Sequence, residues 1–284
     1  MKQFLVIALI VLVIVGGIAL YLFDQEKATG PVVESPAVQA PPPIAQAPEP
    51  ESEPEPETPP PFVVGEKASP GQTQLDELPL PPLNESDDYV RENLESVVGE
   101  AATMQYFASE GLVTRIVATV DMLGSRQVPG NIQAIQGPGG SFAASEDPNP
   151  PTIITNEVGD PIPQYLSDPA NTRRYVAYVE MLEAIDAGQF AALYRKNYPL
   201  FQQAWRELGY TRSDFDDRLV EVIDDLLATP SVEEPYRLIK PEAVYVFADE
   251  ELESLSAGQK IMLRMGSDNA ARVKSKLSEF REAL

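Results

Sequence analysis

The chain has 284 residues, a formal charge of −23, and neither histidine nor cysteine. The missing side chains exclude the usual zinc, haem and iron–sulfur ligand sets, Ser–His and Cys–His nucleophiles, and disulfides. The excess of acidic residues argues against a nucleic-acid partner, because nucleic-acid binding requires a basic face.

The first predicted element is a membrane anchor at residues 4–23, which form 20 consecutive positions without a charged side chain. As a helix they would span about 30 Å, one hydrocarbon thickness. A cleaved signal peptide is the alternative, because Gly17 and Ala19 could form a small-residue cleavage site, although its apolar core would be shorter. Lys2 precedes the segment and acidic residues come after it. The positive-inside rule then predicts a cytoplasmic N-terminus and an exported remainder, which in a bacterium means the inner membrane and the periplasm.

The composition of residues 24–84 predicts a disordered Pro/Glu-rich linker. They contain 16 prolines and 11 acidic residues against two lysines, so they offer little apolar surface to bury and their charges repel one another. In extended polyproline II conformation the segment would reach on the order of 190 Å. A ligand for a proline-binding domain is the alternative to a plain spacer. We therefore divide the chain into a cytoplasmic tip and anchor (1–23), the linker (24–84) and one acidic domain (85–284).

The domain contains 33 acidic and 18 basic residues and is long enough to bury about 70% of its unfolded surface. Apolar residues recur with a helical period, which predicts a mainly α domain of about seven helices with minor β structure. The periodic segments lie at residues 90–98, 112–123, 175–185, 190–208, 215–227, 252–265 and 273–284. Pro199 is expected to bend or restart its helix. The predicted N-caps are Asp168, Thr211 or Ser213, Asp249, and Ser267 or Asp268.

Two regions predict short strands. Residues 141–144 and 152–155 could pair as a hairpin across the turn EDPNPP, and residues 236–247 are rich in aromatic and β-branched side chains. The segment from 125 to 167 has no helical period, and an ordered loop of that length is often functional.

An acidic cluster begins the helix at 215–227: Asp214, Asp216, Asp217, Glu221 and Asp224. Spaced carboxylates could bind a hard cation, but the glycine that an EF-hand loop needs is absent. Acidic residues in a first helical turn are also favoured by the helix dipole. We interpret the cluster as a cap and a solvated face, and we predict neither a metal site nor a cofactor.

Basic side chains outside the apolar stripes are the better candidates for a binding surface. They are Arg173, Arg174, Arg218, Lys260, Arg264 and Arg272. Two interpretations stay open. The guanidinium and ammonium groups could pair with the domain's own carboxylates, or they could bind an anionic ligand or an acidic partner.

Three strings in the domain carry a family resemblance: SDPANTRRYVAYVEMLEAID, FDDRLVEVIDDLLATP and LSAGQKIMLRMGSDNAARVKSKL. Together they resemble a proteobacterial family of unknown function, DUF3014, over most of residues 85–284, and the N-terminal helix with a proline-rich tether is similar to that family's layout. The resemblance supports the architecture but implies no activity, substrate or catalytic residue. The residues that match the pattern are Asn171, Arg174, Tyr175, Arg218, Gly258, Lys260, Arg264, Gly266 and Asn269.

The sequence thus predicts a single-pass inner-membrane protein whose periplasmic helical domain binds or scaffolds an envelope protein or a cell-wall component. A carboxylate-dependent cell-wall hydrolase or accessory, and a domain that senses a small anion, are the alternatives. No catalytic residue is predicted. The candidate binding residues are Arg174, Arg218, Lys260, Arg264 and Asn269.

Overall fold

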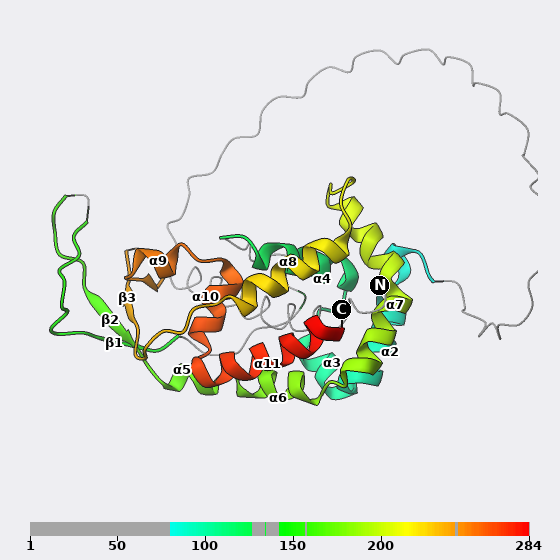
Figure 1. Cartoon of the computed structure of the whole chain (residues 1–284), viewed down its shortest axis with the longest axis horizontal. Helices are drawn as coiled ribbons and strands as arrows, with labels where there is room; N and C mark the ends of the chain where they lie inside the picture. Colours follow the sequence, from blue (N-terminus) through cyan, green and yellow to red (C-terminus); the bar gives the residue numbers. More distant parts are fainter. Residues whose placement is uncertain (1–79, 127–133, 135–141, 157, 242–243, 284) are drawn as a thin grey trace, which may run out of the picture. The chain divides into compact units, whose positions relative to one another are not determined.

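The computed structural model describes residues 80–126, 134, 142–156, 158–241 and 244–283 (Figure 1). Its helices are η1 (Leu83–Glu85), α2 (Asp87–Val98), α3 (Glu100–Tyr106), α4 (Leu112–Leu123), α5 (Ala170–Arg173), α6 (Val176–Ala184), α7 (Ala187–Glu207), α8 (Phe215–Leu227), α9 (Glu250–Glu253), α10 (Ala257–Arg264) and α11 (Ser267–Ala283). Its strands are β1 (Ala144–Glu146), β2 (Gln164–Ser167), β3 (Arg237–Ile239) and β4 (Val246–Phe247). The prediction of a mainly helical domain with minor β structure is confirmed.

The predicted anchor at 4–23 and nearly all of the predicted linker lie outside the described residues. Within the described ranges, no helix is both long enough and apolar enough to cross a membrane. Leu80 and Leu83, which precede the predicted domain boundary, pack against the helical core.

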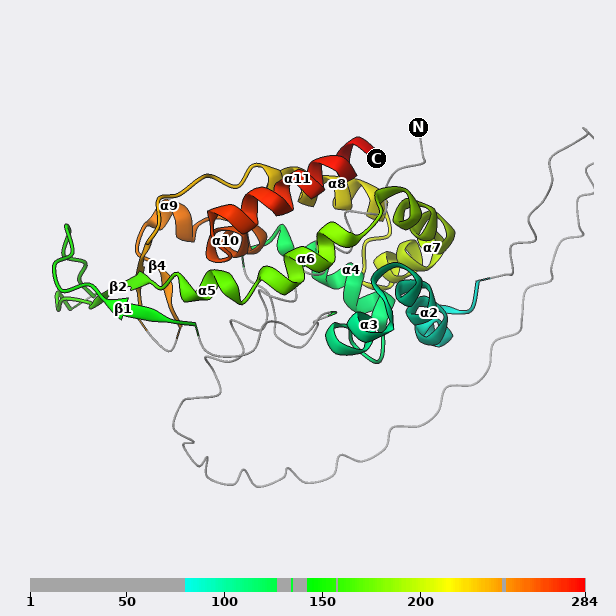
Figure 2. The same ribbon diagram turned by 90° about the horizontal axis from the view of Figure 1, so that it is seen from below.

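The helical core is organised around α4. Apart from the partly buried Met122, its apolar side chains are buried along the whole helix, and it packs against α2, α7, α8 and α10. A second layer is formed by α6 and α11, which run side by side in both views (Figures 1 and 2). The periodic positions that the sequence assigned to the core of this layer are buried, from Tyr175 and Leu182 to Val273 and Phe280. Hydrophobic periodicity therefore identified the inward faces correctly.

Helix boundaries differ from the prediction where local capping competes with a continuous period. The stretch after Asp249 is two helices, α9 and α10, because Ser256 and Gln259 form a reciprocal capping box that starts α10. The N-cap of α8 is Asp214, one residue after the predicted Ser213. Conversely, the sequence predicted a bend or a restart at Pro199, but α7 continues through this residue without a break. Buried residues after the proline offset the lost backbone hydrogen bond.

The four strands form one antiparallel sheet in the order β1-β2-β3-β4. The predicted hairpin between residues 141–144 and 152–155 is wrong, because β1 pairs with β2, with Ser145 opposite Leu166. The intervening chain folds on itself instead. The side chain of Asn156 accepts hydrogen bonds from the backbone N–H groups of Val158 and Asp160, and this local turn removes Thr152–Thr155 from the sheet.

Helix α10 packs closely against α4 and α8 at Gly258. A Cβ atom at Gly258 would lie 2.5 Å from Leu226 Cδ2 and 3.2 Å from the Leu123 carbonyl oxygen, whereas one at Gly188 in α7 would meet only Asp186 Oδ1, at 3.4 Å. Gly258→Ala should therefore lower the free energy of unfolding by about 1 to 2 kcal/mol despite its better helix propensity. Gly188→Ala should raise it by up to about 1 kcal/mol. Urea unfolding of both variants tests the packing, and equal effects would contradict it.

Candidate functional site

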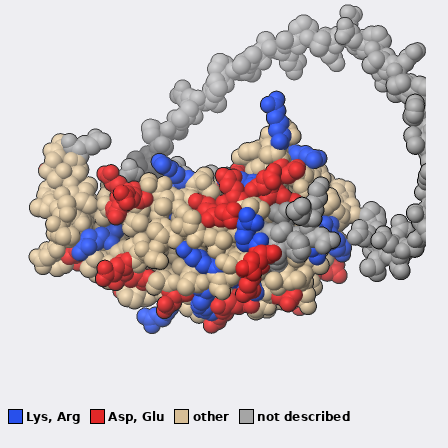
Figure 3. Space-filling view, viewed as in Figure 1, with Lys and Arg blue, Asp and Glu red and all other residues tan. Residues whose placement is uncertain are grey.

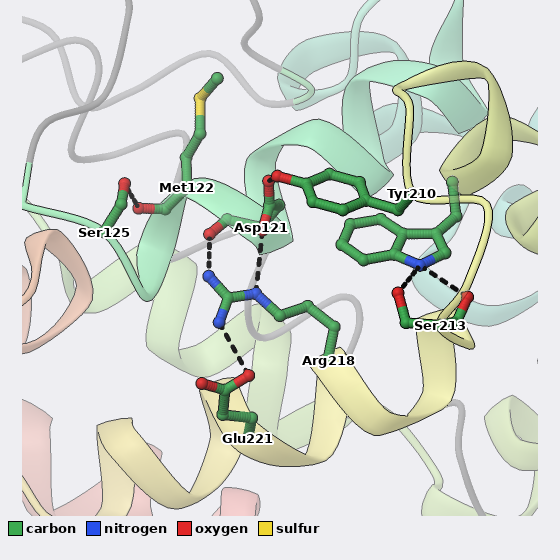
Figure 4. Close-up of polar contacts among 8 residues, drawn as sticks. Asp121, Met122, Ser125, Tyr210, Ser213, Arg218 and Glu221 are labelled. Carbon is green, nitrogen blue, oxygen red and sulfur yellow. Dashed lines mark hydrogen bonds and ion pairs between the residues drawn. The ribbon is translucent and has the colours of Figure 1, made fainter.

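Arg218, the first candidate residue, joins α8 to the C-terminal end of α4 (Figure 4). Its Nε lies 2.9 Å from Asp121 Oδ1, its Nη2 donates to the Asp121 carbonyl at 2.7 Å, and its Nη1 is 2.8 Å from Glu221 Oε2. The Tyr210 hydroxyl donates to the other Asp121 oxygen, and this hydrogen bond raises the pKa of Tyr210. The Tyr210 ring stacks on Trp205 with centroids 3.8 Å apart. Arg218 is thus committed to internal contacts.

Lys260 and Arg264 lie on α10, and both are only 6% exposed. The Lys260 ammonium is 2.7 Å from Glu253 Oε1, and Glu253 Oε2 accepts the Phe247 N–H at 2.9 Å. This chain of contacts joins α10, α9 and β4. Arg264 Nη2 donates to the Tyr245 carbonyl at 2.6 Å. Its guanidinium also lies 5.7 Å from the centres of the Phe142 and Phe247 rings.

Arg174 is the C-cap of α5 and lies next to Tyr175, which is fully buried. Burial raises the pKa of Tyr175 to about 12, while the charges of Arg264 and Arg174 act in the opposite direction. Within the described ranges, no group forms a hydrogen bond with the Tyr175 hydroxyl. The structure therefore places two of the candidate cations around a buried phenol.

The amides among the family-pattern residues connect neighbouring elements. Asn171 exchanges two hydrogen bonds with the backbone of Ala143, at 2.9 and 2.7 Å. Asn269 Nδ2 donates to the carbonyls of Thr172 and Met265, each at 3.0 Å. Gly266 has φ +89°, and a Cβ there would lie 2.8 Å from Thr172 Oγ1. These residues fasten α5 to the sheet side and to the start of α11.

The acidic cluster at the start of α8 also has internal partners. Asp216 accepts from the Tyr194 hydroxyl at 2.6 Å, and Asp214 accepts from the Gln202 amide at 3.1 Å. Asp224 pairs with Arg281 at 2.8 Å. Among the described residues, no group of acidic side chains is close enough to hold a metal ion.

The candidate cations do not form one site: Arg218 and Lys260 pair with different carboxylates, whereas Arg174 and Arg264 both act on the buried Tyr175. A groove of about 690 Å³ lies elsewhere, against the small sheet. Strands β2 and β3 contribute Gln164, Leu166 and Arg237 to its lining. The rest comes from the loop 151–154, from residues 232–236 and from the start of α9. The Glu234–Pro235 peptide bond in this lining is cis.

Acceptor groups dominate the polar lining of this groove. Glu233, Glu234 and Asp249 contribute carboxylates. Arg237 is the basic residue of the lining, and its Nε lies 3.3 Å from Asp147 Oδ2. One oxygen of Glu234 accepts the Ser267 N–H at 2.7 Å, and one oxygen of Asp249 accepts the Glu251 N–H at 2.8 Å. Among the described residues, the second oxygen of each of these two carboxylates accepts no hydrogen bond.

Gln164 is a buried polar residue of the same groove and is 3% exposed. Its Nε2 donates to the Thr152 carbonyl at 2.5 Å. Within the part of the chain that the structure describes, no donor forms a hydrogen bond with its Oε1. This side chain therefore adds another acceptor to the groove.

The groove residues could not be predicted from the sequence, because they come from four separate segments with no characteristic spacing. The unusual length of the 125–167 segment was the only signal. Part of it, the loop between β1 and β2, exposes Ile153 and Val158, which are 71% and 84% exposed. Figure 3 shows this loop, at the left of the view, as a mostly uncharged surface, whereas acidic and basic side chains alternate over the helices. The GPGG stretch at 137–140 lies outside the described residues.

Two other hollows are smaller. One of about 110 Å³ adjoins the groove through Val232, Glu234 and Tyr236, and it is lined by Lys274. The Lys274 ammonium donates to the Thr229 carbonyl, and burial lowers its pKa. The other hollow, of about 460 Å³, lies along α4 beside Tyr210.

The Tyr175 hydroxyl is buried and has no hydrogen-bond partner among the described residues. Tyr175→Phe should leave the free energy of unfolding at pH 7 unchanged or raise it by up to about 1 kcal/mol, because it removes a polar group that lacks a hydrogen bond. The wild type should lose stability as the pH rises from about 10 to about 12, because the unfolded tyrosine ionises near 10.0 and the folded one only near 12. The variant should lose less over this window. Urea unfolding at several pH values tests both statements, and a loss of more than about 1 kcal/mol at pH 7 would show that the hydroxyl is bonded.

Residues 112–281, which contain the groove and most of the core, match a known family. The model of the family described as "Protein of unknown function (DUF3014)" matches residues 112–281, from the first residue of α4 to the last turn of α11. No curated protein and no solved structure matches the chain. The match spans more than half of the chain and includes the three strings that carried the resemblance. The chain therefore belongs to the DUF3014 family of proteins of unknown function.

Proposed function

We propose that the protein is a binding module of the bacterial cell envelope. In this proposal residues 4–23 cross the inner membrane once, the N-terminus is cytoplasmic, and the Pro/Glu-rich linker holds the helical domain in the periplasm. There the domain binds an envelope protein or a cell-wall component. The groove beside the sheet carries the proposal, because its volume of about 690 Å³ is within the range of ligand-binding sites.

The composition of the N-terminal part supports the location. The 20 uncharged residues of 4–23 match one bilayer thickness, and the charges that flank them favour export of the chain beyond residue 23. A linker with 16 prolines would let the domain reach partners well beyond the membrane surface.

The contacts of the cations favour this proposal over the sensing of a small anion. Arg218 and Lys260 are held by Asp121 and Glu253, so an anion would have to displace carboxylates of the protein. Carboxylate-dependent hydrolysis is the second candidate, because three carboxylates line the groove. Cleavage of cell-wall material by the purified full-length protein, abolished by Glu233→Gln, would favour hydrolysis over binding alone.

The topology is tested by reporter fusions. We expect alkaline phosphatase fused after residue 80 to be active, and β-galactosidase fused at the same point to be inactive, because the domain is exported. Fusions made after replacing two apolar residues of 4–23 by Asp serve as the control and should reverse both activities. An active cytoplasmic reporter on the native sequence would contradict the topology.

The groove is tested by photo-crosslinking in cells. A benzoyl-phenylalanine residue at the exposed position of Glu233 should form a covalent adduct with an envelope component, because that position lines the groove. The same residue at Glu92, an exposed position on α2, is the matched control and should give no such adduct. Equal labelling from both positions, or none from the groove, would contradict the proposed binding role.

A further inference from the structure

We infer that the groove recognises an extended peptide segment that carries a lysine or arginine beside small apolar residues. The inference rests on the proposed function, since it names the ligand of the same site. Its basis is a combination of charge, unused acceptors and apolar lining that the described residues show together.

The charge of the lining is negative. It contains three carboxylates and one guanidinium, and that guanidinium lies beside Asp147 rather than beside the groove carboxylates. Glu233 is exposed, and among the described residues its carboxylate forms no hydrogen bond or ion pair. A cation entering the groove would therefore meet carboxylate oxygens that no basic group of this lining neutralises.

The Gln164 acceptor points to the same ligand. This side chain is almost fully buried. Its Nε2 donates to the Thr152 carbonyl, and its Oε1 accepts no hydrogen bond from the described residues. This oxygen lines the groove, so a ligand that supplies an N–H group could donate a hydrogen bond to it. Ammonium and guanidinium groups are donors without acceptors, and they match a lining in which acceptors predominate.

The apolar part of the lining favours a peptide over a sugar or a bare polyamine. Ile154, Leu166, Val232 and Leu252 face the same groove as the carboxylates. Aliphatic side chains on either side of a basic residue would cover these apolar surfaces, and removing apolar surface from water favours binding. A polyhydroxylated sugar would need donors as well as acceptors, and the guanidinium of Arg237 already lies beside Asp147.

The experiment uses fluorescently labelled peptides Gly-Ala-Val-X-Val-Ala-Gly, in which X is Lys, Arg, Gln or Glu, and the full-length protein in detergent. By fluorescence anisotropy, we expect the Lys and Arg peptides to bind at least about tenfold more tightly than the Gln peptide, and the Glu peptide to bind most weakly. Raising the salt concentration should reduce this difference, because part of the attraction comes from solvent-exposed charges.

Two variants assign the effect to the groove. Glu233→Gln should weaken binding of the Lys peptide about three- to tenfold and leave the Gln peptide unchanged, while Glu92→Gln should change neither. Glu233→Lys should reverse the preference between the Lys and Glu peptides. Because Glu233 is exposed and forms no hydrogen bond or ion pair with the described residues, the variants should keep the wild-type melting temperature, which is measured alongside.

The outcomes separate the inference from the proposed function. Equal affinity for all four peptides would overturn the charge preference while leaving a binding groove in place. Failure of every peptide to bind, together with a crosslink from position 233 to cell-wall glycan, would overturn the ligand class only. Failure of every peptide and of the crosslink would overturn both.

Discussion

The structure depends on α10, a helix whose eight residues are all buried although two of them carry a positive charge. A buried cation is tolerated only when it is paired or hydrogen-bonded, because the loss of hydration is otherwise too costly. Lys260 and Arg264 therefore dictate the surroundings of the helix: a carboxylate from α9 on one, and a carbonyl and two aromatic rings of the sheet region on the other. On its opposite side, Gly258 lets the same helix touch α4 and α8 closely. In this way α10 connects the helical core to the sheet, and the sheet carries the groove.

This arrangement explains the role of the family-pattern residues. Arg218, Gly258, Asn171 and Asn269 each fix one element to another through contacts at hydrogen-bond or van der Waals distance. They define an architecture, and an architecture does not specify a function. The groove is lined by other residues, such as Glu233 and Gln164, which the fold positions but does not require for its core.

The sequence predicted the parts of the fold that depend on hydrophobic period and missed those that depend on competition between local and distant partners. The buried faces of α4, α8 and α11 agree directly with the spacing of apolar residues. The division between α9 and α10 was missed because the period continues across a capping box. The pairing of β1 with β2 was missed because residues 152–155, the nearer segment that was expected to pair, belong to the local turn at Asn156 instead. Most candidate binding residues were chosen as basic side chains outside the apolar stripes. Lys260 and Arg264 are nevertheless buried, because burial of a charge depends on partners that sequence spacing does not show.

The pairing of basic side chains with carboxylates of the same domain also bears on the charge of the groove. The region from 85 to 284 contains 33 acidic and only 18 basic residues. Several of the basic side chains pair with the domain's own carboxylates: Arg218 and Lys260 do so in partly buried contacts, and Arg281 pairs with Asp224 at the surface. Each such pair uses one cation and one carboxylate, so the acidic excess stays on the remaining positions, of which Glu233 is an exposed one. Because a negative potential focused in a hollow attracts cations, the pairing that stabilises the helices also favours a basic ligand at the sheet.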